Sequence, residues 1–139
     1  MKTVLLDVNV VLDVLLDRKS HVEGSSAVWA AIETGSARGL LAGHAVTTIH
    51  YLIRKEMGTR EATRIIGAMS RVFGIAAVDD RVIQLALNLP FADFEDAVTA
   101  AAAQLADCDY IVTRDPKGFR ASPVRHLAPE AAVPLLQAG

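Results

Sequence analysis

The chain has 139 residues, 52% of them apolar, which corresponds to one ordinary domain and excludes a disordered chain. Its 14 basic and 16 acidic residues give a formal net charge of −2 at pH 7. That balance excludes a protein that coats nucleic acid by bulk charge, but not one that processes nucleic acid at a local site.

The first half of the chain alternates short apolar runs with stretches of helical spacing. Residues 4–6 are an apolar run closed by Asp7, as in a buried strand, and apolar residues then recur at helical spacing from Asn9 until just before Arg18. The same patterns predict a helix over 25–33, a short strand within 40–46 interrupted by Gly43, helices over 47–55 and 59–69, and a strand over 73–78.

The second half continues this alternation. Asp79 and Asp80 are natural N-caps for a helix over 82–87, which Pro90 and the residues before it end. The remaining predicted elements are a helix over 94–106, strands over 110–113 and 124–127, and a terminal turn at 128–130. Strands separated by helices indicate an α/β fold with a mostly parallel sheet covered on both faces. With no repeat or linker, we expect residues 1–139 to form a single domain.

The sequence has no features of export or membrane insertion. Charge interrupts the N-terminal segment too early for a signal peptide, and no run approaches the roughly 18 apolar residues of a membrane span. The one cysteine, Cys108, excludes an internal disulfide and fits a reducing compartment. We therefore expect a cytoplasmic protein without membrane contact.

Two aspartates follow predicted strands. Asp7 comes directly after the run at 4–6, and Asp115 lies two residues after Thr113. Ligands of open parallel sheets bind outside the carboxyl ends of the strands, so we expect both carboxylates at one crevice. A single aspartate at a strand end is more often a helix cap or a loop residue, and it is the pair that favours a site.

A third acidic group begins the helix predicted over 94–106. It contains Asp93, Glu95 and Asp96, and Asp93 and Asp96 share a helix face. Acids in a first turn also stabilise the helix dipole by roughly 0.3–1 kcal/mol each, which accounts for one or two of them. The small residues after Asp96 indicate a face that packs tightly on the sheet, which would hold Asp96 near the strand ends.

Several carboxylates at one sheet edge repel one another unless a cation lies among them. Oxygen-only ligation suits Mg²⁺ or Mn²⁺. Zinc is disfavoured because Cys108 is alone and the four histidines show no ligand spacing. Because carboxylate-held Mg²⁺ typically activates water and neutralises a phosphate under attack, the residues indicate metal-dependent phosphoryl chemistry.

The acidic residues lie in motifs that occur in a fixed order. The motifs are LLDVNVVLD at 5–13, DFEDAVTAAAA at 93–103, DYIVTRD at 109–115 with Phe119 after it, SPV at 122–124 and LAPE at 127–130. In order and spacing they resemble the PIN-domain ribonucleases, in particular the VapC-type toxins of bacterial toxin–antitoxin pairs. The resemblance covers nearly the whole chain.

This resemblance implies a three-layer α/β/α sandwich and an acidic pocket that binds Mg²⁺ or Mn²⁺. Asp7, Asp96 and Asp115 match the family's metal-ligand and catalytic positions, while Asn9 and Thr113 match positions that support the pocket. The implied reaction is hydrolysis of RNA phosphodiester bonds by a metal-activated water. The implied partners are a cognate antitoxin that masks the site and a second copy of the chain in a homodimer.

The match departs from the family pattern at two positions. The family usually carries a glutamate at the start of the helix after the second strand, and Thr48 aligns with that position. A similar subgroup lacks the same glutamate and carries the extra Asp93, which compensates from one helical turn before Asp96. Gly118 stands where relatives often have a further aspartate. The alternative function is therefore a catalytically weakened PIN-like domain that binds RNA or an antitoxin without cleaving.

Other candidates carry less weight. Arg114, beside Asp115, is a candidate for contact with the substrate phosphate, whereas Asp13 faces either the pocket or, slightly favoured, solvent. His50 lies beside the position of the missing acid, but a single helical histidine is more often packed or exposed. A phosphotransfer receiver or small phosphatase also clusters acids at strand ends, but Asn9 cannot act as the second acid of the first loop.

Overall fold

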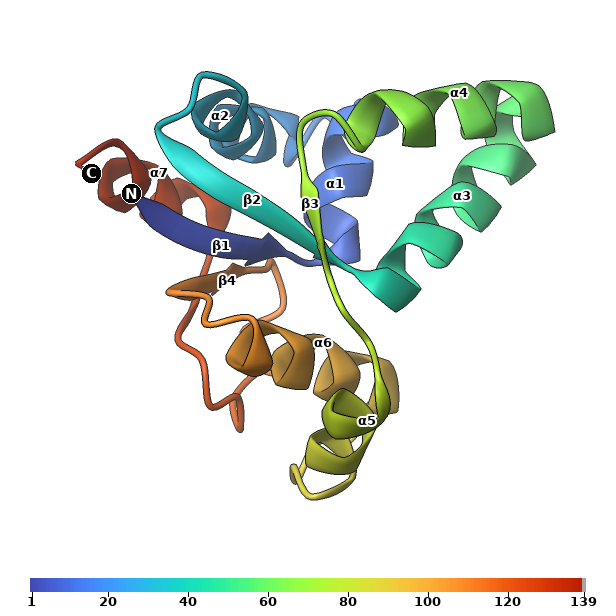
Figure 1. Cartoon of the computed structure of the whole chain (residues 1–139). Coiled ribbons are helices and arrows are strands. Elements are labelled where there is room, and N and C mark those ends of the chain that lie inside the picture. The colour runs from blue at the N-terminus through green and yellow to red at the C-terminus, as the bar shows by residue number, and fades with distance from the viewer. Residues whose placement is uncertain (139) are drawn as a thin grey trace.

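The computed structural model describes residues 1–138 and places five parallel strands in one sheet with the order β3-β2-β1-β4-β5 (Figure 1). The strands are β1 (Lys2–Leu6), β2 (Ala37–Ala42), β3 (Gly74–Ala76), β4 (Tyr110–Val112) and β5 (His126–Leu127). The helices are α1 (Val8–Leu15), α2 (Val22–Glu33), α3 (Gly43–Met57), α4 (Thr59–Met69), α5 (Asp80–Leu87), α6 (Phe94–Leu105) and α7 (Pro129–Gln137).

Helices cover both faces of this sheet. Helices α1 to α4 and α7 enclose one apolar core with the sheet, and α5 and α6 enclose the other. Figure 1 shows α1, α2 and α4 above the strands and α5 and α6 below them. This arrangement confirms the three-layer α/β/α sandwich that the resemblance implied. None of the helices in residues 1–138 is long and apolar enough to cross a membrane.

The first strand shows why the sheet needs both layers. Successive side chains of a strand point to opposite faces, so Val4 and Leu6 enter the core under α1 to α4, and Leu5 enters the core under α5 and α6. All three are buried. A run that is apolar at every position therefore requires cover on both sides, as is usual for parallel sheets.

Helix α6 packs closely on its face of the sheet. Its alanine run, residues 100–103, is almost completely buried in the core that α5 and α6 share. Small side chains allow the helix backbone to approach the strands, and they leave its first turn at the carboxyl edge of the sheet. The orientation of α6 thus fixes where Asp96 lies.

The strands predicted over 73–78 and 124–127 are shorter in the structure, and two other predicted elements differ more. The strand expected within 40–46 ends at Ala42, and α3 begins at Gly43, because Ala45, Ile49 and Ile53 recur every four residues and are all buried. The terminal turn expected at 128–130 is instead the first turn of the helix α7. Two of its residues, Ala132 and Leu136, are fully buried, and the helix packs against α2.

Candidate active site at the carboxyl edge of the sheet

The candidate site lies where the chain connections reverse direction across the sheet. Strand β1 pairs with β2 on one side and with β4 on the other, and Leu6 at its end is opposite Val112. Asp7 directly follows, and its backbone N–H donates to the carbonyl oxygen of Val112 at 2.9 Å. Switch points of this kind open a crevice at the carboxyl ends of the strands, because the flanking helices diverge to opposite faces.

Asp7 is held at this crevice by two hydrogen bonds. Its Oδ1 accepts from the backbone N–H of Val8 at 2.9 Å and so caps α1. Its Oδ2 accepts from the buried hydroxyl of Thr113 at 2.9 Å. These bonds join the first motif to the end of β4, more than a hundred residues later in the chain.

Thr113 also orients Asp115. Its Oγ1 accepts from the backbone N–H of Asp115 at 3.0 Å, and the Asp115 Oδ1 accepts from the backbone N–H of Gly118 at 3.0 Å. The turn after β4 is therefore closed on itself, and the Asp115 carboxylate is bent toward Gly118.

Asp96 reaches the same place from the first turn of α6. A Cβ atom added to Gly118 would lie 3.1 Å from Asp96 Oδ2 and would collide with the Asp115 carboxylate. The two carboxylates thus meet over Gly118, in a space that a side chain at this position would fill. Asp93 is the N-cap of α6, and its Oδ1 accepts from the Asp96 backbone N–H at 3.0 Å.

These carboxylates line one cleft of about 340 Å³. Of the residues predicted for the site, the cleft is lined by Asp7, Asn9, Thr48, Asp93, Asp96 and Asp115. An adjoining cleft of about 440 Å³ shares Asp93, Asp96 and Asp115 and is also lined by the basic residues Lys117 and Arg120. Asp93, Asp96 and Asp115 therefore lie between two clefts, and the second cleft also has basic side chains in its wall.

The carboxylates raise one another's proton affinity. Burial raises the pKa of Asp96 to about 7, and repulsion from Asp7, Asp93 and Asp115 adds to the shift. Burial also raises the pKa of Asp7, against the opposing effect of its hydrogen bonds from Thr113 and Val8. A site with this charge is stabilised by binding either protons or a cation.

The donor set fits a hard divalent cation. The carboxylates of Asp7, Asp96 and Asp115 supply only oxygen ligands, which suit Mg²⁺ or Mn²⁺. Because Gly118 has no side chain, the space between the carboxylates of Asp96 and Asp115 stays open. Within residues 1–138, no three His, Cys, Asp or Glu side chains are already arranged to hold one metal ion together. Asp96 and Asp115 approach each other most clearly, and Asp7 is fixed by its own hydrogen bonds.

Arg114 and Asp13 pair with each other outside this cleft. Arg114 Nε donates to Asp13 Oδ2 at 2.7 Å and Arg114 Nη2 donates to Asp13 Oδ1 at 3.0 Å, while the Ser25 hydroxyl donates to Asp13 Oδ2 at 2.9 Å. The expectation that Asp13 faces either the pocket or solvent is wrong, because its side chain is completely buried in this ion pair. The pairing occupies Nε and Nη2 of Arg114, and the contact of Arg114 with a substrate phosphate stays a prediction.

His50 lies outside the cleft as well. Its Nε2 is 3.0 Å from Thr63 Oγ1, so the ring connects α3 to α4. The sharp turn between these helices is formed by Gly58, whose φ of +88° is strained for residues with a side chain.

Sequence reasoning missed His44. This residue lines the acidic cleft from the first turn of α3, and its Nε2 is 3.3 Å from the Thr99 hydroxyl. Because that hydroxyl donates to the Glu95 carbonyl oxygen at 3.0 Å, it serves His44 as an acceptor. The Nδ1 atom is buried without a hydrogen-bond partner in residues 1–138. The position of His44 along the chain gives no signal of ligand spacing, because only the fold brings this residue to the site.

The other missed residues had a local signal. Lys117 and Arg120 follow Asp115 within five residues, in the basic sequence PKGFR, and line the cleft beside it. Glu95 belongs to the predicted acidic group and lines the first cleft, but it was not assigned a role.

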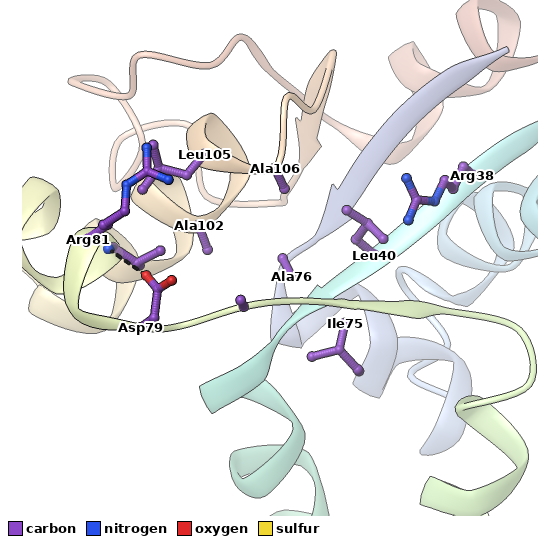
Figure 2. Close-up of a pocket in the computed structure, with 11 residues that line it drawn as sticks. Arg38, Leu40, Ile75, Ala76, Asp79, Arg81, Ala102, Leu105 and Ala106 are labelled. Atoms are coloured by element: carbon purple, nitrogen blue, oxygen red, sulfur yellow. Dashed lines mark hydrogen bonds between the residues drawn. The ribbon is translucent and has the colours of Figure 1, made fainter.

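A separate pocket of about 280 Å³ lies beside β2 and β3, among α5 and the end of α6 (Figure 2). Arg38 and Arg81 stand on opposite sides of it, with Leu40 and Ala76 between them (Figure 2). Its acid, Asp79, accepts a hydrogen bond from the Val82 backbone N–H at 3.2 Å and so caps α5. This pocket shares no residue with the acidic cleft and gathers no group of carboxylates.

The fold and the cleft define a class of protein: a three-layer α/β/α sandwich with an acidic crevice at the switch point of its sheet. Solved structures share this fold, among them three that are each below 20% identical to the chain. VapBC2 from Rickettsia felis, bound to a DNA fragment from its promoter, has a TM-score of 0.73 at 10% sequence identity. The alignment covers 91% of this chain and 98% of the VapBC2 chain.

The other two structures show similar agreement. FitAcB from Neisseria gonorrhoeae has a TM-score of 0.70 at 19% identity, covering 91% of this chain and 97% of its own. VapC20 from Mycobacterium tuberculosis, a sarcin-ricin loop cleaving toxin, has a TM-score of 0.68 at 13% identity, covering 85% of this chain and 94% of its own.

The sequence profile of the PIN domain matches residues 3–117. The chain therefore belongs to the PIN domain family, which confirms the resemblance seen in the motifs. No curated protein matches the sequence.

Proposed function

We propose that this chain is a Mg²⁺- or Mn²⁺-dependent endoribonuclease and the toxin component of a type II toxin–antitoxin pair. The observation that carries the proposal is the meeting of Asp7, Asp96 and Asp115 around one cleft at the switch point of a PIN-domain sheet. The structures with the same fold include a toxin–antitoxin complex from Klebsiella pneumoniae, which supports an antitoxin partner, and a toxin that cleaves the sarcin-ricin loop, which supports RNA as the substrate class.

In this proposal, Asp7, Asp96 and Asp115 bind the metal ion. When bound, the ion activates a water molecule for attack on the phosphodiester and neutralises the phosphate charge that develops. Thr113 fixes Asp7 and the turn of Asp115, so it positions two of the three carboxylates. These hydrogen bonds hold the Asp7 carboxylate and the turn of Asp115 in place before the reaction begins.

Asn9 is placed to contact the substrate. It lines the acidic cleft, and its Oδ1 accepts a hydrogen bond from Arg18 Nη1 at 3.1 Å. The amide nitrogen keeps both of its N–H donors, which we assign to the oxygens of the scissile phosphate or the neighbouring sugar.

Lys117 and Arg120 extend the proposed site along the RNA. Both line the adjoining cleft, and neither forms an ion pair within residues 1–138. We expect the Lys117→Ala/Arg120→Ala double variant to bind RNA more weakly and with a shallower dependence on salt, because each lost phosphate contact removes counterion release. Filter binding at several salt concentrations measures this, and unchanged Mn²⁺ binding is the control that the metal site is intact.

The proposed antitoxin has an apolar surface to bind. A groove of about 550 Å³ between α1, α2 and α4 is lined by Leu15, Trp29, Ile65 and Val72 among others. An apolar helix or strand of the antitoxin fits such a groove, since it would cover side chains that the monomer leaves partly in water.

We also propose a homodimer as the working form, which sedimentation of the purified chain tests.

The deciding experiment is cleavage of structured RNA by the purified chain with Mn²⁺ or with EDTA. We expect cleavage with Mn²⁺, none with EDTA, and none by Asp7→Asn, which keeps a side-chain oxygen to cap α1. Asp17→Asn is the matched control, because Asp17 is exposed and adopts a left-handed φ of 49° that asparagine also tolerates. Cleavage that persists in EDTA or in Asp7→Asn contradicts the proposal.

One observation favours a second candidate, a PIN-like domain that binds RNA or an antitoxin without cleaving. Thr48 lines the cleft where the family resemblance places a glutamate, so α3 contributes no carboxylate. If RNA binds but is not cut with Mn²⁺ or Mg²⁺, this second function replaces the first.

A further inference from the structure

Glu95 is the acidic residue of the cleft to which the proposed function gives no role. It lies in the first turn of α6, directly before Asp96, and its side chain is exposed at the mouth of the cleft. Its Oε1 lies 3.4 Å from the hydroxyl of Thr48 on α3. The carboxylate therefore extends from α6 across the cleft to the side that α3 forms.

The partners of Thr48 show that this contact leaves Glu95 free to bind a ligand. The Thr48 hydroxyl is shared between Glu95 Oε1 at 3.4 Å and the His44 carbonyl oxygen at 3.5 Å, and both contacts are long for a hydroxyl donor. The Glu95 carboxylate has no other hydrogen bond or ion pair within residues 1–138. A carboxylate with four acceptor positions and one weak donor retains most of its capacity to bind a cation.

Asp93 does not have this freedom. Its Oδ1 accepts the backbone N–H of Asp96 at 3.0 Å, which is the N-cap bond of α6. Moving that carboxylate toward an ion would uncap the helix that carries Asp96. Asp93 therefore caps the helix, and the expectation that it compensates for the acid absent at Thr48 stays a prediction.

We infer that Glu95 is a further residue of the metal site and that its carboxylate supplies, from α6, the acidic group that α3 lacks at Thr48. This inference rests on the proposed function, because it concerns the same ion. Thr48 is a positioning residue in it, with a hydroxyl that directs the Glu95 carboxylate into the cleft. The charge of the site is thus carried by four acids from three segments: Asp7, Glu95 with Asp96, and Asp115.

Mn²⁺ binding to the full chain, measured by isothermal titration calorimetry without RNA, tests the inference. We expect Glu95→Gln to weaken Mn²⁺ binding about tenfold, as is typical for the loss of a group that supports a metal site. The matched control is Glu56→Gln, because Glu56 is an exposed glutamate of α3 outside the cleft. This control should bind Mn²⁺ within about twofold of wild type.

A variant that moves the carboxylate from α6 to α3 gives the sharper result. In the double variant Thr48→Glu/Glu95→Gln, the acid returns to α3 beside the place that the Glu95 carboxylate occupies, and we expect Mn²⁺ affinity to recover to near the wild-type value. Recovery indicates that the cleft requires a carboxylate at this place, and it excludes general damage to α6. A double variant that binds as weakly as Glu95→Gln, in a chain whose circular dichroism is unchanged, contradicts the inference.

Asp96→Asn separates this inference from the proposed function. If Asp96→Asn loses Mn²⁺ binding and Glu95→Gln does not, the metal site stands and the role of Glu95 is wrong. If wild type binds no Mn²⁺, or Asp96→Asn binds as well as wild type, the metal site and the role of Glu95 are both overturned.

Discussion

Asp13 and Asp96 are two aspartates near the same sheet edge whose surroundings are opposite. Asp13 is completely buried, and Arg114 neutralises it through two hydrogen bonds of 2.7 and 3.0 Å. Asp96 is half-buried, and the charged groups that act most strongly on it are other carboxylates, which together with burial raise its pKa to about 7.

The difference separates a structural charge from a functional one. The pair of Asp13 and Arg114 connects α1 to the turn after β4, and each charge removes the cost of burying the other. The acids around Asp96 destabilise the protein by repelling one another, and none of them forms an ion pair within residues 1–138. Like charges held together against their repulsion are typical of a binding site.

The largest expected effect comes from breaking the paired charge. Arg114→Ala leaves the buried Asp13 with only a longer contact from Arg18, whose Nη1 lies 3.5 Å from Asp13 Oδ1, and with the Ser25 hydroxyl. We therefore expect it to lower the free energy of unfolding by about 3 kcal/mol, because the stronger of the two ion pairs is lost. Urea unfolding monitored by circular dichroism measures this. Arg114→Lys keeps the charge but not the planar fork, and its loss should be smaller. If Arg114→Ala unfolds at the same urea concentration as wild type, the ion pair does not carry the stability assigned to it.

Removing the unpaired charge should have the opposite effect on stability and a large effect on the metal. We expect Asp96→Asn to lower Mn²⁺ affinity and RNA cleavage about a hundredfold or more, while it raises the melting temperature of the metal-free chain at pH 8 by a few degrees. Calorimetry and thermal denaturation give the two readings, with Asp17→Asn as the control. A melting temperature that falls in Asp96→Asn contradicts the repulsion described here.

The pH dependence tests the same contrast more finely. The pKa of Asp96 is about 7 in the folded chain, whereas its ordinary value is 3.8. Between these two pH values the folded state therefore binds more protons than the unfolded state does. Its contribution to stability is therefore present at low pH and is lost as pH rises through 7.

The measurement is the melting temperature of wild type minus that of Asp96→Asn, without metal. We expect this difference to become more negative from pH 4 to pH 8, and Mn²⁺ to reverse the change at pH 8, where it replaces the proton. A difference that stays constant with pH would show that the Asp96 carboxylate is not perturbed.

The smallest expected effect concerns the space between two unpaired acids. Gly118→Ala places a methyl group against the Asp115 carboxylate and near Asp96 Oδ2, and we expect it to weaken Mn²⁺ binding several-fold because the carboxylates must move apart. Stability should change little, since Asp115 is exposed and its side chain can yield. Calorimetry and urea unfolding on the same sample separate the two effects, and unchanged Mn²⁺ binding would contradict this role of Gly118.

Most of the fold was predictable because its signals are local. The apolar run of β1, the capped start of α5 and the alanine run of α6 each lie within a dozen residues, and each was confirmed as an element of the expected type. The start of α3 was not predictable in the same way. Gly43 interrupts the local pattern, and the burial of Ala45 that extends the helix to this point depends on the sheet beneath it.

The sequence by itself determined that Asp7, Asp96 and Asp115 lie at one edge of the sheet. Strand direction and helix order follow from the alternation of local patterns, and an acid directly after a parallel strand has only one edge to occupy. For the same reason the family was recognisable from motifs that are far apart in the chain.

Only the tertiary structure decided which charges remain free. It paired Arg114 with Asp13, used Asp93 as a helix cap and brought Glu95 to Thr48 and His44 into the cleft. These outcomes depend on distances of a few ångströms between side chains on different elements, and electrostatic energy changes steeply over such distances. Spacing along the chain does not contain that information, so a motif locates a site but does not say which of its charges are neutralised.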